Sequence, residues 1–297
     1  MTVAVTGGAG YLGGLVARTL LETLSPDEVI LITRRPDAVA ADLREAGVQI
    51  RQADFDDPST LEGAFDGADR AMVMTVTFET TGRRVAQHRA AIEAACDAGV
   101  KHIVLPSMPK VDEGHPTGAY ALEYPASEQV LKESGADWTV LQNGPYAENL
   151  IGRAAIAAAT GELTSNAGDG RTAPVSHLDC AAVAAGVLLG DGHAGKTYVV
   201  TGGELFSQAE LAALFSEVSG KPIRLVEFDD ADHPERLRRD GIPEPFPTVL
   251  TRHLHAIRLG YFNDLTTVVQ DITGRPPERL YDVLMEHRAE IVGAGGS

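Results

Sequence analysis

The chain has 297 residues, a formal net charge of −17 at pH 7 and 44% hydrophobic residues. This length allows a large buried core, either in one domain or in a domain with a smaller lobe. The negative charge argues against nucleic acid and anionic membranes as partners, because both need clustered Lys and Arg. No apolar run reaches the length of a membrane span, and the N-terminus leads directly into a predicted strand, so a soluble cytoplasmic protein is expected.

The first half of the chain alternates short apolar runs with amphipathic stretches. The apolar runs predict buried strands at residues 2–6, 29–33, 48–52, 71–75, 102–105 and 138–141. Helices are predicted between them at residues 12–20, 38–46, 84–98 and 125–134, and another is predicted to begin at Asp57-Pro58. Strands joined by helical crossovers form a parallel sheet with helices on both faces. We therefore expect an α/β fold with a Rossmann-type, doubly wound parallel sheet.

After about residue 143 the alternation becomes less regular. Helices are predicted at residues 154–160, 180–189, 207–218 and about 277–291, and strands at 197–201 and 223–228. We interpret residues 1–150 as the core and residues 151–297 as a smaller C-terminal substrate lobe, some segments of which return to the core.

A glycine-rich turn follows the first predicted strand and opens a helix. Residues 6–13, TGGAGYLG, contain the pattern G-x-x-G-x-x-G. In a dinucleotide-binding turn, Gly7 would permit the tight turn, Gly10 the approach of the pyrophosphate, and Gly13 the close packing of helix on sheet. The free N–H groups near Tyr11 and Leu12, with the helix dipole, would hold the phosphates. The alternative is a tight turn that binds no ligand.

The residues after the second predicted strand indicate which dinucleotide this turn would bind. NAD-specific sites place an Asp or Glu there, which accepts a hydrogen bond from the ribose 2′-OH. This chain has Arg34 and Arg35 instead, and their guanidinium groups suit the additional 2′-phosphate of NADP(H). Solvated surface arginines are the alternative. We predict NADP(H) as the cofactor, with residues 1–150 as its Rossmann core.

Two further segments are predicted to flank the adenine of the cofactor. Asp54-Phe55 follows the third strand, and Thr75-Val76 lies at the end of the fourth. Ligands of such sheets bind outside the carboxyl ends of the strands, where both segments would lie. For Asp54 the alternative role is a turn or helix cap.

Together these segments resemble the NmrA-like, atypical short-chain dehydrogenase/reductase family, in particular its quinone-reductase-like branch. The resemblance covers nearly the whole chain. Its most specific part is Asn143-Gly144-Pro145-Tyr146-Ala147-Glu148-Asn149, which is similar to the N-G-x-Y-x-E-N segment of that branch. The other parts are Thr6–Gly13, Arg34, Asp54-Phe55, Ser107, Ala126-Ser127-Glu128, Val175–Asp179 and Thr273-Gly274-Arg275-Pro276.

This resemblance implies NAD(P)H binding by a Rossmann core, with Asn143, Gly144 and Tyr146 among the cofactor-binding residues and a smaller C-terminal substrate lobe. The family includes quinone, imine and ketone reductases. It also includes regulators that bind the dinucleotide without chemistry.

The expected proton-transfer residues depart from the pattern of ordinary short-chain reductases, which use a Ser and a Tyr-x-x-x-Lys pair. Ser107 ends the fifth strand, where the Ser is expected, and Tyr124 is the candidate Tyr. Glu128 rather than Lys follows Tyr124 by four residues, and a nearby carboxylate raises a tyrosine pKa. Ser107 and Tyr124 are the predicted catalytic residues. Weak donation by either one, a proton from the substrate itself, or no reaction all remain open.

Other motifs are rejected. Residues 190–197 match G-x-x-x-x-G-K-T, but a phosphate loop runs from strand to helix, whereas this segment joins a predicted helix to a predicted strand. Ser176, His177 and Asp179 are sequence neighbours and cannot converge as a catalytic triad, so Asp179 is predicted to cap the next helix. No metal site is predicted.

The leading hypothesis is an NADPH-dependent reductase, of the ketoreductase type, that transfers hydride to a carbonyl of a bulky aromatic or polyketide-like small molecule. Hydride would pass beside Asn143–Tyr146 and Ser107. The alternatives are an NAD(P)H quinone reductase and a non-catalytic NADP(H)-sensing regulator. The length and incomplete catalytic set also resemble those of the ketoreductase of simocyclinone biosynthesis. A monomer or homodimer is expected.

Overall fold

The computed structural model describes residues 1–75 and 82–293. A seven-stranded sheet in the order β3-β2-β1-β4-β5-β6-β9 lies at its centre, and every neighbouring pair is parallel. The strands are β1 (Val3–Thr6), β2 (Val29–Thr33), β3 (Gln49–Gln52), β4 (Arg70–Met72), β5 (His102–Ser107), β6 (Asp137–Asn143) and β9 (Lys196–Val200). The strand order reverses between β1 and β4, which places a ligand crevice at their carboxyl ends. The predicted α/β Rossmann-type sheet is confirmed.

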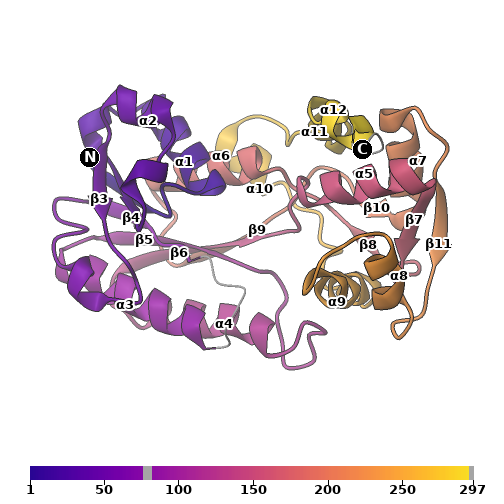
Figure 1. Ribbon diagram of the computed structural model, residues 1–297. Coiled ribbons are helices and arrows are strands. Elements are labelled where there is room, and N and C mark those ends of the chain that lie inside the picture. Colours follow the sequence, from indigo (N-terminus) through magenta and orange to yellow (C-terminus); the bar gives the residue numbers. More distant parts are fainter. Residues whose placement is uncertain (76–81, 294–297) are drawn as a thin grey trace.

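Helices cover both faces of this sheet (Figure 1). On one face lie α1 (Tyr11–Leu21), α2 (Ala41–Ala46) and α6 (His177–Leu189), and on the other lie α3 (Arg83–Asp97) and α4 (Ala119–Lys132). Valines and leucines of α1 and α6 pack on the first face, and Ile92 and Leu131 pack on the second. The central strands β1, β2 and β5 are buried on both sides, and their continuous apolar runs follow from that burial, whereas the edge strands β3 and β9 are partly exposed.

The C-terminal region lies beyond the carboxyl ends of β5 and β6 (Figure 1). Its helices are α5 (Asn149–Thr160), α7 (Gln208–Ser219), α8 (His233–Arg239), α9 (Phe246–Arg258), α11 (Leu280–Glu286) and α12 (Arg288–Gly293). Its short strands are β7 (Glu162–Ser165), β8 (Arg171–Thr172), β10 (Phe206–Ser207) and β11 (Arg224–Glu227), and they form two separate two-stranded sheets. A further helix, α10 (Val268–Thr273), packs against α6 of the core. No helix in residues 1–75 and 82–293 combines the length and apolar character needed to cross a bilayer.

Several element boundaries differ from the sequence prediction. Residues 38–46 form a short 3-10 turn, Pro36–Ala38, followed by α2, and Pro58–Leu61 is likewise only a 3-10 turn. The fourth strand ends at Met72 rather than at residue 75. Beyond it, the backbone of Met74 forms hydrogen bonds with the Thr6 hydroxyl instead of continuing the strand. The prediction was also wrong for α4, which begins at Ala119 and contains Pro125. Favouring Pro in the first turn placed that helix start too late.

Asp179 anchors the chain after α10 to the core. It is fully buried, and its carboxylate accepts hydrogen bonds from Arg275 Nη1 at 2.7 Å and from the Glu278 N–H at 2.8 Å. The N-cap of α6 is Ser176, whose Oγ accepts from the Asp179 N–H at 3.0 Å. The predicted capping role of Asp179 is therefore wrong, because its side chain bonds to a distant segment.

We expect Asp179→Ala to lower the free energy of unfolding by about 2–4 kcal/mol, because the substitution removes a buried carboxylate and leaves Arg275 and the Glu278 N–H without their acceptor. Thermal unfolding followed by circular dichroism measures this change. Asp191→Ala is the control, since the Asp191 side chain is 94% exposed although it also pairs with an arginine. Equal melting temperatures for the two variants would contradict the anchoring role.

Candidate cofactor and substrate site

The glycine-rich turn between β1 and α1 has the geometry of a phosphate cradle. Gly7 has a φ of +66°, and a Cβ on Gly13 would lie 2.4 Å from the Gly7 carbonyl oxygen. The first backbone bond of α1 runs from the Gly14 N–H to the Gly10 carbonyl at 2.9 Å, so the N–H groups of residues 11–13 precede the helical ladder. These groups and the helix dipole can hold an anion. The predicted phosphate contacts remain a prediction that this geometry fits.

Arg34 and Arg35 follow β2 at the same edge of the sheet. Both are exposed, and among the described residues no carboxylate forms an ion pair with either. Together with residues 36–38 and Gln52 they line an open surface depression. Arg34 acts on Asp56 only as a weak contribution to the lowered pKa of that carboxyl, so both guanidinium groups are available to a phosphate.

The segments predicted to flank the adenine lie in different settings. Asp54 belongs to a local turn: its Oδ1 accepts from the Asp56 N–H at 3.1 Å, and its own N–H donates to Thr60 Oγ1 at 2.8 Å. That turn is the alternative role stated for Asp54. Phe55 packs partly against the core. Thr75 accepts a hydrogen bond from Arg84 Nη1 at 3.5 Å, and Val76 lies outside the described residues.

The Asn143–Asn149 segment leaves the carboxyl end of β6 and enters α5. Gly144 lies so close to β9 that a Cβ would be 3.2 Å from the Val200 carbonyl oxygen. Asn143 Nδ2 donates to the Tyr146 hydroxyl at 3.2 Å, while the buried Asn143 Oδ1 has no partner in the described part of the chain. Burial raises the pKa of Tyr146, so its hydroxyl stays protonated at neutral pH. The segment thus holds one free acceptor and one neutral phenol beside the sheet edge.

His177 and Glu148 join this site, although the sequence analysis assigned neither a role there. The His177 ring stacks on Tyr146 with centroids 3.9 Å apart, and the edge of Tyr11 meets it at 5.1 Å. The backbone N–H of His177 donates to Glu148 Oε1 at 2.9 Å, and the ring Nδ1 of His177 lies 2.7 Å from Glu148 Oε2. Burial opposes ionisation of Glu148, but the hydrogen bonds from His177 hold its pKa below the ordinary value. The family resemblance of residues 175–179 was the signal that could have identified His177. The structure pairs Val175 with Tyr146 in an isolated β-bridge, which brings this segment beside the Asn143–Asn149 segment.

Ser107 lies at the end of β5, and its hydroxyl is committed to Glu128. The Ser107 Oγ donates to Glu128 Oε1 at 2.6 Å inside a buried pair. The same carboxylate accepts from Gln142 Nε2 at 3.0 Å and from Lys132 Nζ at 3.1 Å. The Glu that replaces the usual Lys therefore binds the Ser, and a lysine neutralises it one helical turn later.

Tyr124 lies beside a cation that the sequence analysis did not find. The guanidinium of the buried Arg84, on α3, is 4.5 Å from the centroid of the Tyr124 ring. Arg84 Nη2 donates to the Tyr120 hydroxyl at 2.7 Å, and the Tyr120 and Tyr124 hydroxyls are 3.3 Å apart. Burial raises the pKa of Tyr120. The cation beside Tyr124 therefore comes from α3 and lies over its ring, whereas a lysine at the fourth position after it would belong to the same helix.

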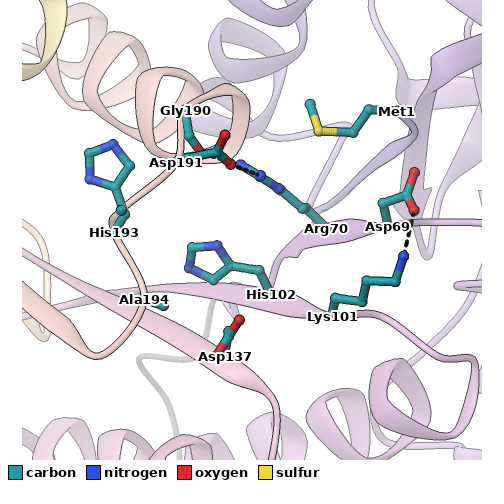
Figure 2. Close-up of a pocket in the computed structure, with 11 residues that line it drawn as sticks. Met1, Asp69, Arg70, Lys101, His102, Asp137, Gly190, Asp191, His193 and Ala194 are labelled. Atoms are coloured by element: carbon teal, nitrogen blue, oxygen red, sulfur yellow. Dashed lines mark hydrogen bonds and ion pairs between the residues drawn. The ribbon is translucent and has the colours of Figure 1, made fainter.

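The loop that matches the phosphate-loop pattern lies at the opposite edge of the sheet, where β4, β5 and β6 begin. A cavity of about 370 Å³ lies there. Figure 2 shows residues that line it, with Arg70 paired to Asp191 and Lys101 paired to Asp69. Arg70 also donates to the carbonyls of Leu188 and Gly190 at the end of α6. The loop thus runs from the end of α6 into β9, which is the order from helix to strand that was predicted for it.

Comparison with known proteins gives a family for this geometry. Residues 7–209 match the profile of the NAD(P)H-binding family. Quinone oxidoreductase 2 of Escherichia coli K12 is 34% identical over 94% of this chain and 96% of its own, and the NAD(P)H azoreductase of Xenophilus azovorans is 30% identical over 98% and 100%. The structure of the E. coli quinone oxidoreductase with NADPH superimposes on this chain with a TM-score of 0.87 at 30% identity. The match covers 96% of this chain and 99% of that one.

The NADP(H) complex of Citrobacter sp. triphenylmethane reductase gives a TM-score of 0.89 at 29% identity, covering 96% of this chain and 99% of that one. These relatives give no support to the resemblance to the simocyclinone ketoreductase. With the glycine turn, the Rossmann sheet and the Asn143–Asn149 segment in place, the chain belongs to the NAD(P)H-binding, NmrA-like family of atypical short-chain dehydrogenases/reductases.

Proposed function

We propose that this protein is an NADPH-dependent reductase whose preferred acceptors are quinones. The observation that carries the proposal is the joint environment of the two predicted catalytic residues. Ser107 is bound to a carboxylate, and Tyr124 has an arginine rather than a lysine beside it. An acceptor that is strongly electrophilic by itself, such as a quinone, needs little help from a general acid. The name of the E. coli relative, a quinone oxidoreductase, supports the same choice.

The residues present fit NADPH. Backbone N–H groups of residues 11–13 would hold the pyrophosphate, and Arg34 and Arg35 would hold the 2′-phosphate. The unpaired Asn143 Oδ1 is an acceptor suited to the amide N–H of the nicotinamide carboxamide. When bound, NADPH supplies the hydride.

Protein groups would then orient the acceptor and handle a proton. Tyr124 is the candidate donor, because its hydroxyl lies 3.3 Å from that of Tyr120, which in turn accepts a hydrogen bond from Arg84. Tyr146, packed between Asn143 and His177, would fix one wall of the site. This arrangement also supports a second candidate function, reduction of an aromatic ketone, since a donor phenol remains available.

Stopped-flow mixing of the NADPH-loaded protein with a panel of quinones and aryl ketones tests the proposal. We expect loss of NADPH absorbance within seconds with quinones and at least about tenfold slower with ketones. Quinone reductions by the protein must exceed the rate of the uncatalysed reaction at equal NADPH. Tight NADPH binding without oxidation by any acceptor would overturn the proposal and favour a redox-sensing regulator.

A further inference from the structure

Arg153, on α5, carries a positive charge without a carboxylate partner. Its Nη2 donates to two neutral acceptors, the Thr164 carbonyl at 3.3 Å and Gln208 Oε1 at 2.9 Å. Its Nε and Nη1 have no hydrogen-bond partner among residues 1–75 and 82–293, and no Asp or Glu of those residues forms an ion pair with it. Burial lowers the pKa of Arg153 to about 10, against a weaker opposing effect of Glu227, so the group is charged at neutral pH. The side chain of Arg153 is only partly buried, so its unpaired Nε and Nη1 remain accessible to a ligand.

His253, on α9, is a second polar group without a partner. Its ring packs against Phe262 with centroids 4.9 Å apart, and neither ring nitrogen forms a hydrogen bond within the described part of the chain. Burial, followed by the charges of Arg153 and His115, lowers the pKa of His253 to about 4. The neutral ring keeps one N–H that can be donated.

The segment that begins with β7 contacts both helices that carry these groups, and the charge of Arg153 acts on His253. Arg153 is bonded to Thr164 of β7, and the neighbouring Asn166 donates from Nδ2 to the Thr251 carbonyl of α9 at 3.0 Å. On the far side of His253, Phe262 packs with Met108, which directly follows Ser107. On the other side, Arg153 lies about one helical turn beyond Asn149, the end of the cofactor-side segment. Arg153 thus lies on the helix that follows β6, and His253 packs on a cluster that includes Met108, the residue directly after β5.

Gln208, which accepts a hydrogen bond from Arg153, adds a further unpaired donor. Gln208 is fully buried, its Oε1 faces Arg153, and its Nε2 has no partner in the described residues. Buried donors of native proteins are almost always satisfied, so the unpaired Gln208 Nε2 calls for an acceptor, while Arg153 and His253 are partly exposed and can meet a ligand from solvent. Three groups with free N–H donors, one of them cationic, match an oxyanion.

We propose that Arg153 and His253 form a subsite for an anionic substituent of the acceptor, a carboxylate or sulfonate carried apart from its reducible carbonyl. This inference rests on the proposed reductase function and narrows it to acidic aromatic acceptors. Arg153 would bind the oxyanion through its free Nε and Nη1 edge, and His253 would add one neutral N–H.

Paired acceptors test the subsite. Initial rates with 1,2-naphthoquinone and 1,2-naphthoquinone-4-sulfonate are compared for the wild type, Arg153→Met and Arg239→Met. The last variant removes an exposed arginine of α8 that pairs with Glu235 and serves as the matched control. We expect Arg153→Met to lower kcat/KM for the sulfonate by about 10–100-fold and that for the uncharged quinone by less than about threefold. Equal losses for both acceptors, or none, would overturn the subsite.

A binding measurement separates this inference from the proposed function. Calorimetry of the NADP⁺-loaded protein with 2-naphthalenesulfonate, 2-naphthoate and 2-naphthol needs no turnover. We expect both anions to bind at least about tenfold more tightly than the phenol, and the difference to vanish in Arg153→Met. If no quinone is reduced but this difference is present, the reductase proposal fails and the subsite stands. If Arg153→Met does not fold, His253→Phe provides the same comparison, and an unchanged preference for the anions would refute the subsite.

Discussion

Replacing Arg34 with Ala is expected to weaken NADPH binding about 10–100-fold while NADH binding changes less than about threefold. A hydrogen bond to a charged group contributes about 1.5–3 kcal/mol, and each 1.4 kcal/mol is a tenfold change in Kd. Arg34 is exposed and has no ion pair among the described residues, so its replacement should leave the fold intact. The Arg34→Ala/Arg35→Ala double variant should extend the loss of NADPH affinity further.

Fluorescence titration of both dinucleotides gives the two dissociation constants. Arg44→Ala is the matched control, because Arg44 is an exposed arginine on α2, away from the end of β2. It should alter neither constant. Equal losses of NADPH and NADH affinity in Arg34→Ala would refute the 2′-phosphate role, and would leave only the glycine turn to account for dinucleotide binding.

Replacing Tyr124 with Phe should lower kcat about a hundredfold for ketone acceptors, because a positioned general acid contributes about 10²–10⁴-fold. The loss should be smaller for quinones, whose reduction depends less on a proton donor. NADPH affinity should stay unchanged, since the predicted contacts of the cofactor lie on other residues. Steady-state kinetics with one ketone and one quinone, together with an NADPH titration, measure all three quantities.

Tyr198→Phe is the control for this variant. Tyr198 also carries a partly buried hydroxyl, but its partner is His193, beside the cavity at the opposite edge of the sheet. Unchanged ketone turnover in Tyr124→Phe would show that the proton comes from the substrate or from another residue. A parallel loss of NADPH affinity would instead assign Tyr124 a structural role.

The core of this protein could be predicted from its sequence because local patterns determine it. A few neighbouring residues are enough to determine the local structure of each of its parts. Examples are the apolar runs at residues 29–33 and 102–105 and the glycine turn at residues 7–13. Boundaries were less predictable where a tertiary contact overrides a local preference, as in α4 with its internal Pro125.

The side-chain pairs of the site could not be predicted from spacing. Arg84 reaches Tyr120 across 36 residues, and Glu148 meets His177 across 29. Such contacts depend on how two elements pack in three dimensions, and the spacing of residues along the sequence does not predict that packing. The missing lysine was visible in the sequence, whereas the arginine beside Tyr124 became apparent only when α3 was placed against α4.

The route of the chain between the core and the C-terminal region has a consequence for protein engineering. After α5 and β7 the chain returns as α6 and β9, which cover and extend the main sheet, and α10 packs on α6 later still. A fragment cut after residue 150 would therefore leave β6 as an exposed edge and strip the apolar surface of α1. Chimeras that exchange acceptor preference between relatives need three simultaneous replacements, roughly residues 148–176, 201–266 and 277–293, because α11 and α12 pack on α5 and α7 and a single crossover would break up the sheet.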